Sequence, residues 1–442
     1  MRFCWRTSVR VTLGVAAVGA AVGFLSGPIA ADEPAAPQAS DEVTPVPPAR
    51  APSRAGRTFP GLDPSRHRVE DGVALADLAD GSTALLSLDP SLQAHLTGIF
   101  ARHEVPFGAA IALEPATGRV LAYVSHSSED PSAGDLVLDP SAPAASVFKI
   151  VTGAALFEAG VSPDAEVCYH GGLRRLNDGH LEDDPARDRS CASLAGAMGG
   201  SINPIFAKLA VRHLDPPTLE RYASAFGFGH ALPFDVPTRA SPMEVPPDRL
   251  EFARTAAGFW HMHLSPLHGA LIAATIANGG RMPRPTLVDE VIDASGAITY
   301  EASPAMHREV IAEPTAAAVT RMMQRTLARG GTGRQWFFDP SGEPFLPGIE
   351  VAGKTGTLAS NDPYRSYTWF VGFAPVEEPR IAVAALVVNG ARWRIKGSFV
   401  AREAMRHWLV TRPRQLREAA RRAEREAAAS AAEPESDATA AR

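Results

Sequence analysis

The runs with β-strand character fall into two groups, one early in the chain and one late, and this separation limits the folds that the chain can adopt. Residues 108–113 and 119–124 are short β-rich runs around a Pro-Ala-Thr-Gly turn, which is a hairpin pattern. Three more runs follow one another much later, at 349–357, 367–373 and 381–388. The stretch between the groups, 165–345, has mostly helical patterns with loops rich in Asp, Pro and Gly. We therefore expect an α+β fold, with a five-stranded antiparallel sheet flanked by helices and an inserted, mostly helical subdomain.

Three segments have the pattern of helices that belong to this core. Residues 92–103 carry apolar side chains at helical spacing. Residues 146–160 are apolar on nearly every face of a helix, so we expect this helix to be buried, with Gly160 as its stop. Residues 405–410 end an amphipathic helix that we expect to cover the sheet.

The first 31 residues have the pattern of an export signal. Arg2, Arg6 and Arg10 precede an uncharged apolar run at 11–25, and small residues follow it. The run is shorter than the roughly 20 residues that a membrane span needs. We expect residues 1–31 to be a signal peptide or a retained membrane anchor, which places the body of the protein in the cell envelope: exported to the periplasm, or anchored there in the inner membrane.

The next segment, 32–84, reads as a Pro/Ala-rich tether and lead-in to a folded domain at 85–411. The stretch from Ala31 to Pro60 holds seven prolines and cannot build a core. We expect residues 61–83 to be a poorly packed lead-in, which leaves no room for a glycosyltransferase domain. Residues 412–442 are rich in Arg, Glu and Ala and then polar, typical of a solvated helix and tail, with a basic membrane-surface helix as the alternative.

Charge and cysteine content narrow the class of protein. The net charge of -6 gives no basic field for nucleic acid. If a signal peptide is removed, Cys4 leaves with it, and Cys168 and Cys191 remain. In an oxidising compartment such a pair predicts a disulfide, with two separate buried thiols as the alternative.

Only four of the 43 basic residues are lysines, and Lys149 lies in the run Ser146-Val-Phe-Lys149. Positions i and i+3 share a helix face, so the amine can reach the hydroxyl. A serine hydroxyl is a poor nucleophile without an adjacent base, and burial lowers the pKa of a lysine enough for it to serve. The other interpretation is a helix residue whose amine reaches solvent, which the apolar neighbours of Lys149 disfavour.

Two further motifs follow in order, Ser201-Ile-Asn203 and then Lys354-Thr-Gly-Thr357. Together with Ser-x-x-Lys this set resembles the penicillin-binding proteins and the serine β-lactamases. The likeness extends over roughly 85–409, and its clearest stretches outside the motifs are 113–125, 265–268, 276–280 and 368–375. The resemblance implies a transpeptidase-like domain that is acylated by β-lactams and needs no cofactor or metal.

The resemblance also implies a role for each motif residue. Ser146 is the nucleophile and Lys149 its base, while Ser201 relays a proton to the leaving amine and Asn203 binds the substrate backbone. Lys354 faces the substrate carboxylate, and the hydroxyls of Thr355 and Thr357 bond to it. Gly356 suits a strand edge that a substrate backbone approaches. The N–H groups of Ser146 and Thr357 would form the oxyanion hole.

The expected activity is a D,D-transpeptidase acting on peptidoglycan stem peptides, with other cell-envelope proteins as partners. A carboxypeptidase that uses water, a class D-like β-lactamase and an envelope sensor without turnover remain alternatives. The Glu-x-x-x-Asn run of class A β-lactamases is missing, because none of the five asparagines has Glu four places before it. One departure from the family is the run 258–264, Gly-Phe-Trp-His-Met-His-Leu, where many members have Gly-Gln-Gly. This run leaves the acyl acceptor open, and we expect no metal at His261 and His263.

Overall fold

The computed structural model describes residues 57–432, and the side chains of residues 57–424. The predicted signal or anchor segment, 1–31, and most of the predicted tether lie outside the described residues. Among the described helices, none combines the length and the hydrophobicity that a membrane-spanning segment requires.

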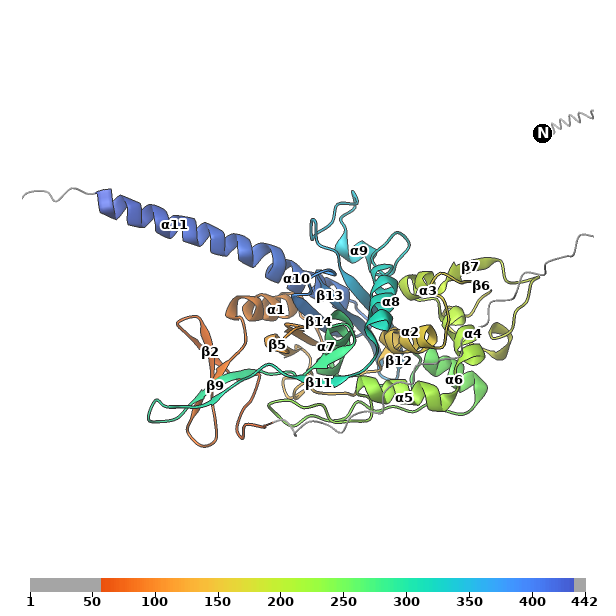
Figure 1. The fold of residues 1–442 in the computed structure, drawn as a ribbon, viewed down its shortest axis with the longest axis horizontal. Coiled ribbons are helices and arrows are strands. Elements are labelled where there is room, and N and C mark those ends of the chain that lie inside the picture. Colours follow the sequence, from red (N-terminus) through yellow and green to blue (C-terminus); the bar gives the residue numbers. More distant parts are fainter. Residues whose placement is uncertain (1–56, 433–442) are drawn as a thin grey trace, which may run out of the picture. The chain divides into compact units, whose positions relative to one another are not determined.

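The main sheet has five antiparallel strands, as the two groups of β-rich runs predict. Its order is β12-β13-β14-β4-β5. The strands are β12 (Ala352–Asn361), β13 (Tyr364–Ala374), β14 (Ile381–Asn389), β4 (Phe107–Leu113) and β5 (Val120–Ser127). The late group joins the early group where β14 pairs with β4, so the orange and blue ends of the described chain lie side by side (Figure 1).

Helices cover both faces of this sheet and divide the core in two. On one face lie α1 (Pro90–Arg102) and α10 (Gly397–Arg406), followed by one π-helical turn (His407–Thr411). On the other face lies α7 (Pro266–Ala277). Strand β14 is buried along its whole length, and its alternate residues enter the two hydrophobic clusters because successive side chains point to opposite faces.

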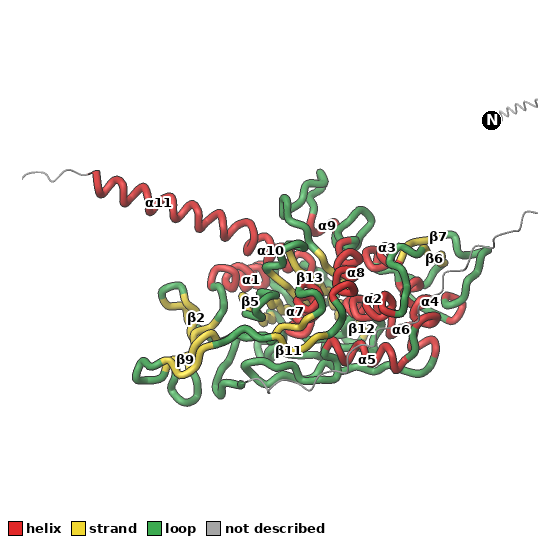
Figure 2. Tube along the Cα trace, viewed as in Figure 1, coloured by secondary structure: helices red, strands yellow, loops and turns green. Residues whose placement is uncertain are grey.

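The inserted region is mostly helical but also contains strands, which the sequence patterns do not predict. The predicted buried helix at 146–160 is α2 (Lys149–Glu158), which precedes this region. The helices of the inserted region include α3 (Leu194–Gly200), α4 (Asn203–His213), α5 (Pro216–Phe226), α6 (Arg249–Ala256), α8 (Glu313–Gln324) and α9 (Arg334–Phe337). Two small strand pairs accompany them, β6 (Glu166–Tyr169) with β7 (Ser190–Ser193), and β8 (Arg281–Pro283) with β11 (Met306–Glu309). Figure 2 shows β6 and β7 in yellow beside α3 and α4.

The expectation that residues 61–83 are poorly packed is wrong. They contribute to a second five-stranded sheet, in the order β1-β2-β3-β9-β10. Its strands are β1 (Arg68–Glu70), β2 (Val73–Asp77), β3 (Thr83–Leu86), β9 (Val288–Ile292) and β10 (Ile298–Glu301). Ala74, Ala84 and Leu86 are buried in this sheet. Each strand is short, and β3 pairs both with the neighbouring β2 and with β9, which lies far along the chain.

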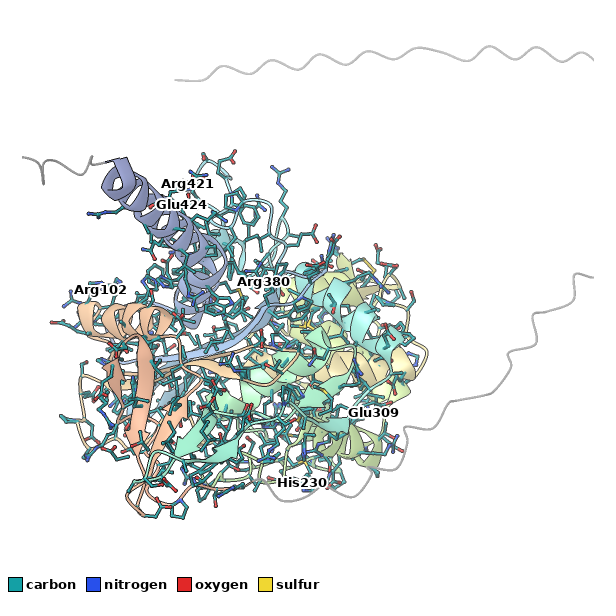
Figure 3. All side chains as sticks on the ribbon, turned by 60° about the vertical axis from the view of Figure 1, so that its left-hand side comes forward. Arg102, His230, Glu309, Arg380, Arg421 and Glu424 are labelled. Atoms are coloured by element: carbon teal, nitrogen blue, oxygen red, sulfur yellow. A yellow bond between two sulfur atoms is a disulfide. The ribbon has the colours of Figure 1, made fainter. Side chains whose placement is uncertain are left out.

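The last described element is α11 (Arg412–Ala432). Arg412 is tied to the domain because its Nε lies 2.6 Å from a carboxylate oxygen of Asp89. Farther along, side chains such as Arg421 and Glu424 are exposed (Figure 3). A helix is thus present after residue 412, and its exposed side chains suit both predicted settings, solvent and a membrane surface.

Candidate active site

Ser146 lies in a short 3₁₀ turn, Ala145–Phe148, that leads directly into α2. Lys149 is the first residue of α2, and its Nζ lies 2.9 Å from Ser146 Oγ. The lysine side chain is fully buried, whereas Ser146 is partly exposed. The predicted pair is thus in contact, with a partly exposed serine and a buried amine.

The three contacts of Lys149 Nζ define what the amine can do. It donates to Ser146 Oγ, to Asn203 Oδ1 at 2.6 Å and to the carbonyl of Ala257 at 2.5 Å. Those three acceptors match the three N–H groups of an ammonium. The oxygens of Asn203 and Ala257 can only accept, so a neutral amine keeps its two N–H groups on them. Its lone pair then faces Ser146, the only one of the three groups that can donate.

The electrostatics favour that neutral amine. Burial, with a smaller contribution from the charge of Lys354, lowers the pKa of Lys149 well below its ordinary value. Burial also lowers the pKa of Lys354, to about 7. A lysine whose pKa is lowered in this way can act as a base, which an arginine cannot do.

The second motif connects the two lysines. Helix α3 ends at Ser201 in a left-handed conformation, with φ of 54°, and α4 begins two residues later at Asn203. Ser201 Oγ accepts a hydrogen bond from Lys354 Nζ at 3.0 Å. Asn203 is buried and donates its Nδ2 to the carbonyl of Leu173 at 2.7 Å. Ser201 therefore belongs to the Lys354 side of the site and Asn203 to the Lys149 side.

The third motif lies on β12. Lys354 is fully buried, and Thr357 is exposed. Gly356 is buried, and a Cβ there would lie 3.2 Å from Val147 Cγ2 and 3.4 Å from the carbonyl oxygen of Ala144. The glycine thus lets β12 pack closely against the turn of the nucleophile. The approach of a substrate backbone to this residue stays a prediction.

Thr355 has a partner that sequence reasoning missed. Its hydroxyl lies 2.6 Å from the hydroxyl of Thr332, which in turn donates to the carbonyl of Gly199 at 3.2 Å. Thr332 therefore joins β12 to the end of α3 beside Ser201. The Gly-Thr-Gly run at 331–333 is the only local signal for this residue. The hydroxyl of Thr355, predicted to bind a substrate carboxylate, is already engaged in this structure.

The unusual run 258–264 packs directly against the segment before the nucleophile. The N–H of Ala144 donates to the carbonyl of Met262 at 2.8 Å. Gly258 has φ of +83°, and a Cβ there would lie 2.4 Å from the carbonyl oxygen of Ala145. Trp260 is 45% exposed and has φ of 28°. His261 lies 2.9 Å from a carboxylate oxygen of Glu251, so it is paired with an acid.

The two predicted disulfide partners lie opposite each other on β6 and β7. Their Sγ atoms are 2.04 Å apart, which is bonding distance. The bridge closes a loop, residues 169–190, whose Leu173 carbonyl contacts Asn203. The cysteine pair thus belongs to the surroundings of the site.

The fold and these contacts define a domain built around a buried lysine and an accessible serine, with a second serine–lysine pair beside them. The family described as "Penicillin binding protein transpeptidase domain" matches residues 108–409, and the chain belongs to this family.

Known relatives agree with this assignment. The chain is 31% identical over 329 residues to peptidoglycan D,D-transpeptidase PbpA of Mycobacterium tuberculosis, covering 64% of this chain and 62% of that protein. It is 29% identical over 326 residues to PbpA of Mycolicibacterium smegmatis, covering 64% of this chain and 62% of that protein. The imipenem acyl-enzyme complex of penicillin-binding protein A from M. tuberculosis is 26% identical with a TM-score of 0.61, covering 74% of this chain and 80% of that one. The chain spans less than two thirds of the length of the two PbpA sequences.

Proposed function

We propose that this protein is a serine-type peptidoglycan D,D-transpeptidase. The observation that carries the proposal is the environment of Lys149 Nζ, whose two acceptor-only contacts leave the lone pair of the neutral amine facing Ser146 Oγ. The names of the relatives, peptidoglycan D,D-transpeptidases, support the choice of substrate.

In the acylation step, Ser146 Oγ attacks the carbonyl carbon of a D-Ala-D-Ala peptide bond and its proton passes to Lys149. A C–O ester bond forms, and the C–N bond breaks as the terminal D-Ala leaves as an amine. The leaving nitrogen needs a proton, and Ser201 is suited to deliver one because its hydroxyl contacts Lys354 Nζ. Lys354, when protonated, also supplies positive charge for the terminal carboxylate of the substrate.

In the second step, the amine of an acceptor peptide attacks the ester, and Ser146 regains its proton. Water in place of this amine gives a D,D-carboxypeptidase, which uses the same residues. A β-lactam acylates Ser146 in the same way, but its leaving nitrogen stays attached to the acyl group.

We further propose that the domain works in the cell envelope. The export pattern of residues 1–31 and the Pro/Ala-rich segment after it suit a catalytic domain delivered across a membrane. Cleavage of the leader would release a periplasmic protein, and its retention would anchor the domain.

The decisive experiment is mass spectrometry of the protein incubated with benzylpenicillin. We expect a single adduct on the peptide containing Ser146, lasting for hours, and no adduct with Ser146→Ala at unchanged thermal stability. An adduct on Ser146→Ala would refute the nucleophile. Decay of the adduct within seconds would favour a β-lactamase over a transpeptidase. A stable adduct without D-Ala release from donor peptides would favour a sensor.

A further inference from the structure

The loop between the two cysteines, residues 169–190, forms part of the active site through its main chain. The carbonyl of Leu173 accepts the Nδ2 of Asn203 at 2.7 Å, and the Oδ1 of the same amide faces Lys149. An acceptor at Leu173 is compatible with only one of the two orientations of the Asn203 amide. This loop, here called the cysteine loop, therefore touches a residue of the predicted substrate site.

A buried cation fixes the base of the cysteine loop. Lys208 is fully buried on α4, and its Nζ donates to the carbonyl of Cys168 at 3.0 Å and to Asp188 Oδ2 at 2.7 Å. Asp188 also lies 2.5 Å from the ring of His170. Burial alone would raise the pKa of Asp188, but the hydrogen bonds from Lys208 and His170 hold it below its ordinary value. The loop thus has a charged anchor on the same helix that carries Asn203.

Helix α6 fixes the loop a second time, nearer its tip. Arg254 donates to the carbonyl of Leu176 at 2.8 Å, and Arg249 lies 2.6 Å from a carboxylate oxygen of Glu182. The tip, Leu173 to Arg175, lies between the anchored carbonyls of Cys168 and Leu176, and all three of its residues are exposed. A tip held from both sides presents its side chains without the entropy cost of ordering a mobile loop.

The tip carries two cations without partners. Within residues 57–424, neither Arg174 nor Arg175 makes an ion pair or a side-chain hydrogen bond, whereas Arg187, in the same loop, is paired with Asp184. Arg174 and Arg175 follow directly after the carbonyl that holds Asn203. Exposed guanidinium groups on a loop whose main chain contacts Asn203, a predicted substrate-binding residue, suit the recognition of a carboxylate on the bound ligand.

We propose that Arg174 and Arg175 recognise an acidic donor peptide, binding a carboxylate other than the terminal one that faces Lys354. This inference rests on the proposed function and adds a substrate preference to it. The two positions favour donors with a free carboxylate over donors in which the same carboxylate is amidated. Because both arginines are exposed, the preference is a matter of a few-fold in affinity and falls with salt.

The test compares two synthetic peptides ending in D-Ala-D-Ala that differ only in a free α-carboxylate or a carboxamide on an internal glutamyl residue. The readout is the peptide concentration that halves the rate of labelling by a fluorescent penicillin, so it does not require turnover. For the full chain, we expect the carboxylate peptide to be about fivefold more effective in low salt. In R174Q/R175Q, the two peptides become equal while labelling without peptide keeps its rate.

The matched control is R187Q/R189Q, which removes the same charge from the cysteine loop near its base and should keep the fivefold preference. An unchanged preference in R174Q/R175Q, an equal loss in the control, or a native protein that does not distinguish the peptides would overturn the inference. Absence of labelling at Ser146 in the native protein would instead refute the proposed function, and the inference with it.

Discussion

The Oδ1 atom of Asn203 lies 2.6 Å from the Nζ of Lys149. Together with the Ala257 carbonyl, this oxygen holds the two N–H groups of the neutral amine, so that the remaining lone pair is directed at Ser146. The base is therefore oriented by a residue 54 positions away in the chain. This arrangement makes separate predictions for the amine, for the amide and for the second lysine.

Lys149→Arg should fail almost as badly as Lys149→Ala, because a guanidinium keeps the charge but cannot accept a proton. We expect the second-order rate constant of penicillin acylation to fall by at least about 100-fold, within the usual range for loss of a general base. Lys396→Arg is the matched control, since that lysine is partly buried and lies 4.9 Å from the ring of Trp393. Acylation of Lys149→Arg at the native rate would show that charge, and not basicity, is required.

Asn203→Asp should make acylation depend on higher pH. A carboxylate at this position stabilises the ammonium form of Lys149 and so raises the pKa of the base from its lowered value. The acid limb of the pH–rate profile should move up by one unit or more, with a loss of roughly tenfold at pH 7 that is partly recovered at pH 9. Asn361→Asp adds the same charge at the exposed end of β12 and should leave the profile in place. An acid limb that does not move would mean that Asn203 does not control the base.

Lys354→Met should stabilise the protein while impairing acylation. Burial lowers the pKa of Lys354 from 10.5 to about 7, so the unfolded chain binds more protons between these pH values. The free energy of unfolding should therefore rise with pH across this window. Below pH 7 the folded protein bears the full cost of burying the charged amine of Lys354. We expect Lys354→Met to raise the free energy of unfolding at pH 7 by about 2–4 kcal/mol. The increase of this free energy between pH 7 and pH 10 should become smaller in the variant.

Urea unfolding of both proteins from pH 6 to pH 10 measures this effect. The buried Lys149 contributes a slope of the same sign, so some pH dependence should remain in Lys354→Met. A variant that is less stable than the native protein at pH 7 would show that the contact with Ser201 outweighs the cost of burying the amine.

Non-reducing peptide mapping of the exported protein should find the peptide of Cys168 joined to that of Cys191. The two residues are separated by 23 positions. A bridge over a loop of that length lowers the conformational entropy of the unfolded chain and so stabilises the folded protein by about 3 kcal/mol. Replacement of both cysteines by serine should lower the free energy of unfolding by about the same amount. Two alkylatable thiols in the native exported protein would contradict the prediction.

Much of the site could be predicted because its motifs are local. Lys149 follows Ser146 by one 3₁₀ turn, so their contact is set by spacing alone. The contact of Ser201 with Lys354 spans 153 positions, and only the family resemblance places both residues in one site. The carbonyl of Leu173 could not be predicted, because a main-chain contact does not depend on which side chain the residue carries.

The parts of the fold that were missed share a physical cause. The apolar run of β14 predicts a buried strand, whereas its pairing with β4 is known only from the structure. Strand β1 has three residues, all exposed, and β3 gains its burial only from pairing with β2 and β9. β2 and β3 do alternate in burial, but runs of only five and four residues are too short for a sequence pattern to stand out.

The pairing of β14 with β4 has a consequence for how the domain is made. During synthesis, the β4–β5 hairpin and the Ser146 turn emerge long before the strand that completes their sheet. Until the chain has been extended past Asn389, the hairpin keeps an open edge of unpaired N–H and carbonyl groups, which invites pairing with other chains. Contacts of such large sequence separation also slow folding. The nascent protein therefore depends on protection from aggregation through most of its own translation, and a product truncated before β14 would expose this edge permanently.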